Sequence, residues 1–312
     1  MCGTVALLLS FIDREKLLDG LTQVSLGVIL ASVALGIVRT WLVGNRWRIL
    51  NPDPSGQVTT WDYFRYMMIG NTYNLLMPGQ MGGDLSRVIL VSREVQEDRA
   101  SNVFSILVDR MIGITSIIAL GLVACLMAPA LPQRSSYLAM ILVVAAVFGI
   151  AGALVTARTP NRILRRCLSK AGRWGKSATR VVELWETALD FYRERSSRML
   201  LALALCVPIH ATTFLILHLF SLELGISVSF LSLSTVMVLV WVITVLPITF
   251  AGIGVREVSF VYLLSLQSVP PEQATALSLC FFLATVLLAL LGIPFLLLRR
   301  KTSAHDPARP GP

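Results

Sequence analysis

The chain has 312 residues, of which 55% are hydrophobic and 14% are charged, and its formal net charge at pH 7 is +9. Soluble globular proteins carry about 25% charged residues, so too little polar surface remains here to cover a particle that is exposed to water. This composition disfavours a disordered chain, a nucleic-acid-binding module and a disulfide-stapled secreted domain. It indicates a membrane protein.

The positive charge is concentrated between the apolar runs. Eleven of the 27 Lys and Arg residues fall between Arg158 and Arg198, and Arg299, Arg300 and Lys301 follow the last apolar run. This distribution is what the positive-inside rule expects of cytoplasmic segments. We therefore predict an inner-membrane protein whose residues 158–198 and C-terminus face the cytoplasm, and no nucleic-acid partner.

Six apolar runs reach about 20 residues, the length that a helix needs to cross roughly 30 Å of hydrocarbon. In chain order these are Leu21–Gly44, Met111–Ala130, Tyr137–Ala157, Met199–Phe220, Phe230–Phe250 and Ala274–Leu298. Met1–Ile12 would rise only about 18 Å as a helix, and Val255–Val269 is also short. Trp61–Val91 mixes apolar residues with Asn, Pro, Gly and charged residues.

The cations near the runs set the topology. If Arg39, Arg46 and Arg48 and the later cationic segments all face the cytoplasm, the chain crosses the membrane about eight times. That count closes only if Trp61–Val91 enters and leaves on one face, and irregular backbone at membrane depth must be buried in protein or line a wet cavity. We expect an all-α polytopic helical membrane protein with about eight transmembrane helices and two re-entrant or broken-helix segments.

The segments 158–198 and 302–312 differ from the rest of the chain. We expect a single membrane domain, residues 1–301, made of two weakly similar halves at about 1–157 and 199–301. The joining segment carries apolar residues at steps of three or four with Arg and Lys opposite, so it is predicted to lie on an anionic leaflet. A linker helix packed on the bundle is the alternative. The Pro-containing tail is predicted to be disordered.

A short pattern occurs once in each half of the chain. Pro78, Gly83 and Arg87 have the same spacing as Pro247, Gly252 and Arg256, and Gly82 and Gly254 lie nearby. Paired Gly/Pro interruptions of apolar segments are a sequence signature of a transporter's binding site. Broken helices expose helix-end amides, which together with an arginine form an anion site suited to phosphate. Two helix kinks without a ligand are the alternative.

Charged residues at membrane depth are costly and mark functional or paired sites. Six occur here, namely Asp84, Arg87, Asp109, Arg110, Arg256 and Glu257. Asp84 and Arg87 have the spacing to face one another on a helix, whereas the adjacent pairs Asp109–Arg110 and Arg256–Glu257 are expected to point apart. Three acids and three bases sum to zero, so an arriving anion would compete for the arginines. Ion pairs that only fasten helices together are the alternative.

Two asparagines and two histidines are weaker candidates for ligand binding. Asn71 and Asn74 precede the first interruption, where their amides could satisfy backbone groups or contact a sugar or phosphate. His210 and His218 lie eight residues apart without a third ligand at metal spacing, so packed histidines are expected. The five cysteines show no C-x-x-C pair, and no nucleophile-elbow or dinucleotide-binding motif occurs. We expect no metal and no cofactor.

These segments in combination resemble the flippase-like transmembrane family, which includes the membrane domain of bacterial lysylphosphatidylglycerol synthases. The resemblance is carried by residues 71–87, by residues 108–110 with Gly113, and by residues 246–257. Asp109 stands where a glutamate is more usual, and residues 249–252 lack a further glycine. The resemblance implies that the chain moves a phospholipid between leaflets. The separate domain that attaches the amino acid in the synthases is not expected in this chain.

We interpret the sequence as a lipid flippase that moves an anionic phospholipid or a polyprenyl-phosphate-type lipid, not as an enzyme. The predicted substrate-binding residues are Asn71, Asn74, Pro78, Gly82, Gly83, Asp84, Arg87, Asp109, Arg110, Pro247, Gly252, Gly254, Arg256 and Glu257. Membrane lipids with anionic headgroups are the expected partners, and a cytoplasmic lipid-modifying enzyme is a candidate. The alternatives are a membrane scaffold for such an enzyme, and an intramembrane enzyme that acts on lipid phosphates.

Overall fold

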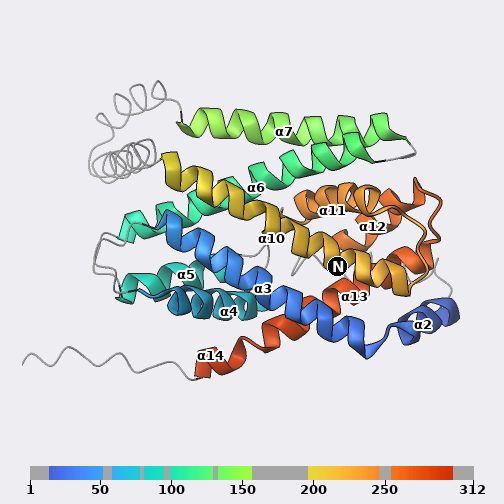
Figure 1. Ribbon diagram of the computed structural model, residues 1–312, viewed down its shortest axis with the longest axis horizontal. Coiled ribbons are helices and arrows are strands. Elements are labelled where there is room, and N and C mark those ends of the chain that lie inside the picture. Colours follow the sequence, from blue (N-terminus) through green and yellow to red (C-terminus); the bar gives the residue numbers. More distant parts are fainter. Residues whose placement is uncertain are drawn as a thin grey trace, which may run out of the picture.

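The computed structural model describes residues 14–51, 58–77, 81–94, 99–128, 133–156, 196–245 and 254–297. Every regular element in these ranges is a helix (Figure 1). The helices are α2 (Arg14–Gln23), α3 (Leu26–Leu50), α4 (Thr60–Leu76), α5 (Met81–Glu94), α6 (Arg99–Met127), α7 (Arg134–Thr156), α10 (Ser196–Glu223), α11 (Phe230–Val245), α12 (Val255–Ser265), α13 (Pro271–Leu290) and α14 (Ile293–Leu297).

Among the described helices, four are long and apolar enough to cross a membrane, and two are shorter and apolar. The long ones are Leu26–Leu50, Asn102–Met127, Ser197–Glu223 and Pro271–Leu297, and the shorter ones are Arg134–Val147 and Phe230–Thr244. Large side chains such as Leu30, Leu126 and Leu200 are exposed on the outer surface, where a lipid environment accommodates them. The prediction of an all-α helical membrane protein is confirmed.

The predicted boundaries of the first span are wrong. Residues 21–23 belong to α2, and α3 starts only after Ser25, whose hydroxyl accepts a hydrogen bond from the Val28 N–H at 3.4 Å. The Ser25 N–H donates to the Glu223 carboxylate of α10 at 2.8 Å, which fixes this break between the helices. At its other end α3 continues past Gly44 to Leu50, so Arg46 lies inside the helix.

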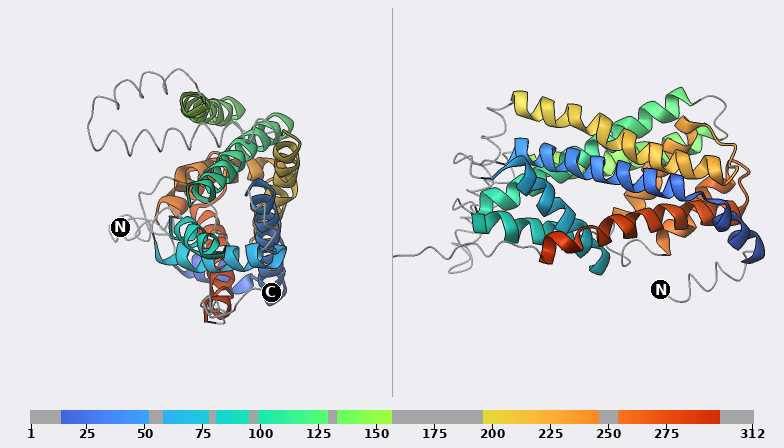
Figure 2. Two further views of the ribbon diagram at one scale, coloured as in Figure 1. Left: turned by 90° about the vertical axis from the view of Figure 1, so that its left-hand side faces the viewer. Right: turned by 60° about the horizontal axis from the view of Figure 1, so that its bottom comes forward.

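The segment Trp61–Val91 forms two neighbouring helices. Both α4 and α5 lie at the end of the bundle where α3 finishes and α6 begins (Figure 1; Figure 2, right). Their backbones approach closely because glycines face the contact: a Cβ on Gly82 would lie 2.8 Å from the carbonyl carbon of Tyr73, and a Cβ on Gly70 would lie 3.4 Å from the Cα of Gly83. The helices α11 and α12 form a second pair towards the opposite end (Figure 1).

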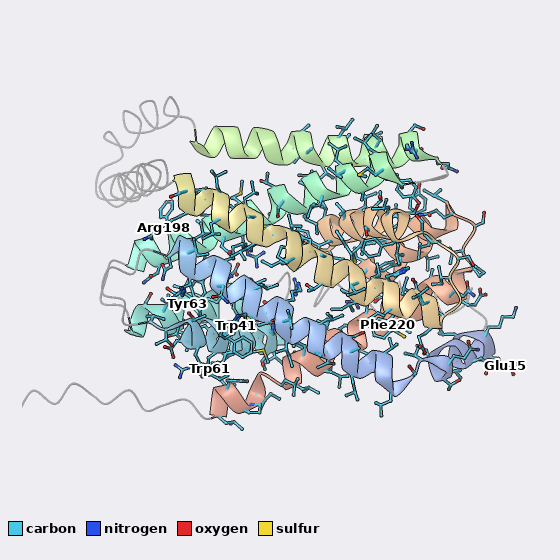
Figure 3. All side chains as sticks on the ribbon, in the orientation of Figure 1. Glu15, Trp41, Trp61, Tyr63, Arg198 and Phe220 are labelled. Atoms are coloured by element: carbon cyan, nitrogen blue, oxygen red, sulfur yellow. The ribbon has the colours of Figure 1, made fainter. Side chains whose placement is uncertain are left out.

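Aromatic residues gather where α3, α4 and α14 meet. Trp41 and Trp61, labelled in Figure 3, both pack against Phe64, with ring centroids 5.5 and 5.2 Å apart, and Phe64 packs against Phe295 at 5.9 Å. Trp41 and Trp61 are also exposed. Exposed tryptophans of this kind are enriched at the two interfaces between membrane and water.

Several expectations fall on residues outside the described ranges. These are Met1–Ile12, almost all of the basic amphipathic segment 158–198, the tail 302–312, and the two interruptions with Pro78, Pro247 and Gly252. The division of the membrane domain into two similar halves stays a prediction.

Candidate functional site

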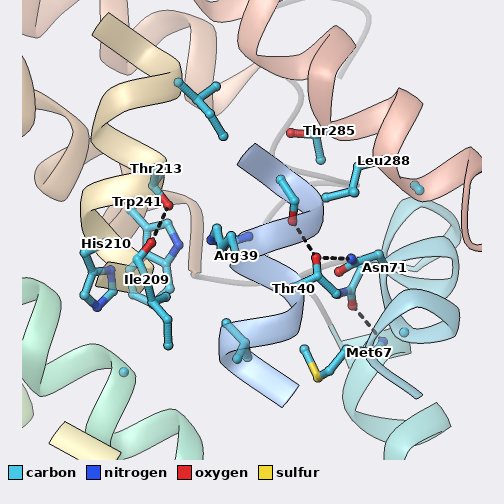
Figure 4. Close-up of a pocket in the computed structure, with 18 of the residues that line it drawn as sticks. Arg39, Thr40, Met67, Asn71, Ile209, His210, Thr213, Trp241, Thr285 and Leu288 are labelled. Carbon is cyan, nitrogen blue, oxygen red and sulfur yellow. Dashed lines mark hydrogen bonds between the residues drawn. The ribbon is translucent and has the colours of Figure 1, made fainter. Parts of the chain in front are cut away.

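A cavity of about 300 Å³ lies in the middle of the bundle, and helices from both halves of the chain line it (Figure 4). Eight predicted site residues are on its wall: Asn71, Asn74, Gly83, Asp84, Arg87, Asp109, Arg110 and Arg256. These residues come from the last turns of α4, the first turns of α5, the middle of α6 and the start of α12. Gly82, Gly254 and Glu257 are described but do not line the cavity.

Asp109 of α6 holds two arginines from other helices. Its Oδ1 accepts a hydrogen bond from Arg46 Nε at 2.7 Å, and its Oδ2 accepts one from Arg87 Nη2 at 3.1 Å. All three side chains are buried, and Asp109 is only 2% exposed. Gly113, one turn further along α6, leaves room for the Arg46 guanidinium, because a Cβ there would lie 3.3 Å from Nη2.

Asp84 of α5 continues this network. Its Oδ1 lies 3.5 Å from Arg87 Nη1, so the predicted pairing within α5 is present but long. Its Oδ2 accepts a closer hydrogen bond from Arg110 Nε of α6. Arg87 also stacks on the Trp47 ring, with its guanidinium carbon 4.2 Å from the ring centroid. Asp109 and Arg110, as predicted from their adjacency, reach different partners.

Arg256 and Glu257 form the second charged group. The expectation that these neighbours point apart is wrong, because Arg256 Nη2 donates to Glu257 Oε1 at 2.9 Å. Gly254 has a φ of +88°, and this conformation lets its N–H reach Glu257 Oε2 at 2.5 Å and turns the carboxylate back towards Arg256. Ser278 donates to the same Oε1 at 3.2 Å, and Arg256 lies over the Phe282 ring at 4.6 Å.

The two asparagines are held by protein groups. Asn74 Oδ1 accepts the hydrogen bond of the Gly83 N–H at 2.7 Å, and a Cβ on Gly83 would press on that amide. Asn71 Nδ2 donates to Thr40 Oγ1 at 3.2 Å. The backbone N–H groups of Gly83 and Gly254 therefore already donate hydrogen bonds to Asn74 and Glu257. At these two helix ends, the nearby arginines are the groups that can bind an anion.

Both histidines have hydrogen-bonding partners, as expected for packed residues. His210 Nε2 lies 2.9 Å from Ser116 Oγ, and His218 Nδ1 lies 3.4 Å from Ser221 Oγ. His210 differs from His218 in that it also lines the cavity.

Comparison with known proteins places the chain in a family. The family model of the lysylphosphatidylglycerol synthase TM region matches residues 2–292. The chain belongs to this family. The match concerns the membrane region of these synthases, and no catalytic synthase domain was detected with it. No curated protein and no solved structure matches the chain.

In this member of the lysylphosphatidylglycerol synthase TM family, two wall residues were misassigned from the sequence. Arg39 and Arg46 were predicted to flank a span on the cytoplasmic side, but both line the cavity from inside α3. With them, five arginines line the cavity, against Asp84 and Asp109 on its wall and Glu257 beside Arg256. The predicted sum of zero counted three arginines, and the two additional ones bring the charge of these described residues to +2. The spacing of Ser32, Gly36, Arg39, Val43 and Arg46 along one helical face was the available signal.

Proposed function

We propose that the protein moves an anionic lipid, of the phospholipid or polyprenyl-phosphate type, between the two leaflets. The observation that carries the proposal is the central cavity, which is lined by five arginines and only two acids, with Glu257 paired to Arg256 beside it, inside a membrane-spanning bundle. Charges at membrane depth are expensive, and an excess of one sign there suits a substrate of the other sign.

The size of the cavity agrees with a headgroup. Ligand pockets that enclose drug-sized molecules span about 300 to 1,000 Å³, and this cavity of about 300 Å³ is at the lower end. A phosphate with a small alcohol fits such a space, while the acyl chains stay in the bilayer. Apolar wall residues such as Ile117, Met237 and Phe281 surround the polar groups, so the dielectric constant is low and charge-assisted hydrogen bonds are strengthened.

The helix pairs α4/α5 and α11/α12 give the proposal its mechanism. In this reading they are two re-entrant hairpins that enter from opposite faces, as in transporters with inverted repeats. Their inner ends supply Asn74, Asp84, Thr244 and Arg256 to one cavity. Rocking of one pair against the other would expose the headgroup site first to one leaflet and then to the other.

The attachment of the cationic segments supports an orientation. α3 ends near the exposed Arg48, α10 begins, and α14 ends at the same end of the bundle (Figure 1). We propose that this end is cytoplasmic, which places residues 158–198 and the C-terminus in the cytoplasm of the cell.

The test is leaflet exchange in liposomes. Purified protein with fluorescent phosphatidylglycerol is expected to accelerate exchange over empty liposomes, and Arg87→Ala and Arg256→Ala to abolish the acceleration. Because Arg256→Ala leaves Glu257 buried without its charged partner, the double variant Arg256→Gln/Glu257→Gln removes both charges together and leaves polar side chains in their place. Arg48→Ala, at an exposed position of α3, is the matched control and is expected to keep wild-type exchange.

Three outcomes separate the candidate functions. Exchange equal to that of empty liposomes for several phosphate-bearing lipids would reject the flippase and favour a scaffold for a lipid-modifying enzyme. A change in the covalent structure of the recovered lipids, seen by mass spectrometry, would favour an intramembrane enzyme. Accelerated exchange of unchanged lipid, lost in the arginine variants while size-exclusion profiles stay the same, supports the proposal.

A further inference from the structure

The five arginines of the cavity differ in whether an acid holds them. Arg46 and Arg87 are paired with Asp109, Arg110 is paired with Asp84, and Arg256 is paired with Glu257. Arg39 has no ion pair or hydrogen bond to any residue that the structure describes, and its Nε atom is buried without a partner. It is thus the cavity arginine whose charge no described acid balances.

Arg39 points into the cavity from the middle of α3. Figure 4 shows its side chain between Thr213 and His210 of α10 on one side and Asn71 of α4 on the other. The neighbouring charge is repulsive, because Arg46 lies two turns further along the same helical face. The other polar groups on the cavity wall include a histidine, amides and hydroxyls, among them Ser32, whose buried Oγ also lacks a partner among the described residues.

Such an arginine is costly to the empty protein. Arg39 is partly buried, and its Nε has lost water without gaining a partner among the described residues; the repulsion from Arg46 adds to this cost. Groups that destabilise a fold and yet face a cavity are typical of binding sites, where stability is traded for function. An anion that pairs with Arg39 removes the penalty without displacing any acid, whereas at Arg87 or Arg256 it has to compete with Asp109 or Glu257.

We propose that Arg39 is the primary contact for the phosphate group of the cargo, and that the acid-held arginines act as secondary contacts. The shared ligand chemistry is a phosphate monoester or diester. That the phosphate belongs to a lipid rests on the proposed function. Guanidinium donates two parallel hydrogen bonds to phosphate oxygens, which an ammonium cannot do.

The test measures binding and stability on the full-length protein in detergent. Isothermal titration calorimetry follows dihexanoyl phosphatidylglycerol, inorganic phosphate and dihexanoylglycerol, which lacks phosphate. Arg39→Gln is expected to weaken the binding of dihexanoyl phosphatidylglycerol at least tenfold, and Arg39→Lys to retain part of the affinity. Arg48→Gln makes the same substitution at an exposed position of the same helix and is expected to leave the affinity unchanged. Dihexanoylglycerol is expected not to bind.

Melting temperature distinguishes a binding role from a structural one. Because Arg39 has no partner among the described residues to lose, Arg39→Gln without ligand is expected to melt at or above the wild-type temperature, while its stabilisation by phosphatidylglycerol disappears. A structural arginine would show the opposite, with a lower melting temperature. That result would overturn the proposal, and so would wild-type affinity of Arg39→Gln for phosphatidylglycerol.

The same variants separate this proposal from the proposed function. If Arg39→Gln exchanges lipid at the wild-type rate, the proposed flippase function stands and the proposed role of Arg39 is overturned. If the wild-type protein gives no leaflet exchange but its phosphate binding depends on Arg39, the role of Arg39 stands and the flippase function is rejected. Inorganic phosphate that binds as tightly as the short-chain lipid would assign the site to free phosphate instead of a headgroup.

Discussion

Removing the acid at the centre of the network tests how the cavity is held together. Asp109→Asn keeps the shape of the side chain and deletes the charge that holds Arg46 at 2.7 Å and Arg87 at 3.1 Å. Arg87 keeps Asp84 at 3.5 Å, but Arg46 is left without an acid among the described residues. Breaking a buried ion pair costs about 3 to 5 kcal/mol. The charge of the cavity group rises by one unit.

The expected result is a less stable protein that binds anions more tightly. At roughly 2 to 4 °C per kcal/mol for a chain of this size class, the melting temperature falls by roughly 10 °C. Because the cavity of Asp109→Asn carries one more positive charge, dihexanoyl phosphatidylglycerol is expected to bind it more tightly and to stabilise it more than the wild type. A ligand at 100 times its Kd contributes about 2.7 kcal/mol. Fluorescence-detected melting in detergent measures both effects, with the exposed Asp19→Asn as the control.

A difference of about 2 °C corresponds to roughly 1 kcal/mol. If Asp109→Asn melted within that range of the wild type, the ion-pair network would not be a main source of the bundle's stability. The excess positive charge would not attract the ligand if the lipid raised the melting temperature of Asp109→Asn and of the wild type by the same amount. Either result refutes one link of the reasoning, and the two measurements are independent.

Two glycines give further predictions. Gly82→Ala is expected to destabilise the protein by about 2 kcal/mol or more, because its Cβ would press on the backbone carbonyl of Tyr73, and α4 and α5 would have to part; Gly149→Ala, with nothing within 4 Å, is expected to melt like the wild type. Gly254→Ala is expected to cost about 1 to 2 kcal/mol, because φ is +88° there. If that loss persisted in the background of Glu257→Met, which removes the acceptor, backbone strain would account for it; if it vanished, the hydrogen bond to Glu257 would. Thermal melting checks both substitutions.

Patterns that depend on composition and on local spacing were read correctly. The apolar runs predicted a helical membrane protein, because any segment in hydrocarbon must satisfy its backbone within a helix. The repeated spacing of proline, glycine and arginine singled out Arg87 and Arg256, and both line one cavity. That these two residues bind substrate stays a prediction.

Pairings between distant segments could not be predicted. Arg46 was assigned to a cytoplasmic flank, since an arginine at the end of an apolar run is ordinarily a flanking charge. Its partner Asp109 lies 63 residues away, on a helix that the sequence does not align with α3. The turn of Glu257 back onto Arg256 depended on the positive φ of Gly254, a conformation that the sequence permits but does not require.

The amino-acid sequence by itself determined the helical class, the membrane setting and six of the charged residues, because hydrophobicity and helical period act over neighbouring residues. Only the tertiary structure decided which acid holds which arginine, and that Arg39 has none in the part of the chain that the structure describes. The physical reason is that a charge balance in a cavity is a property of side chains brought together from several helices. Their distances come from how the helices pack, which no local pattern encodes.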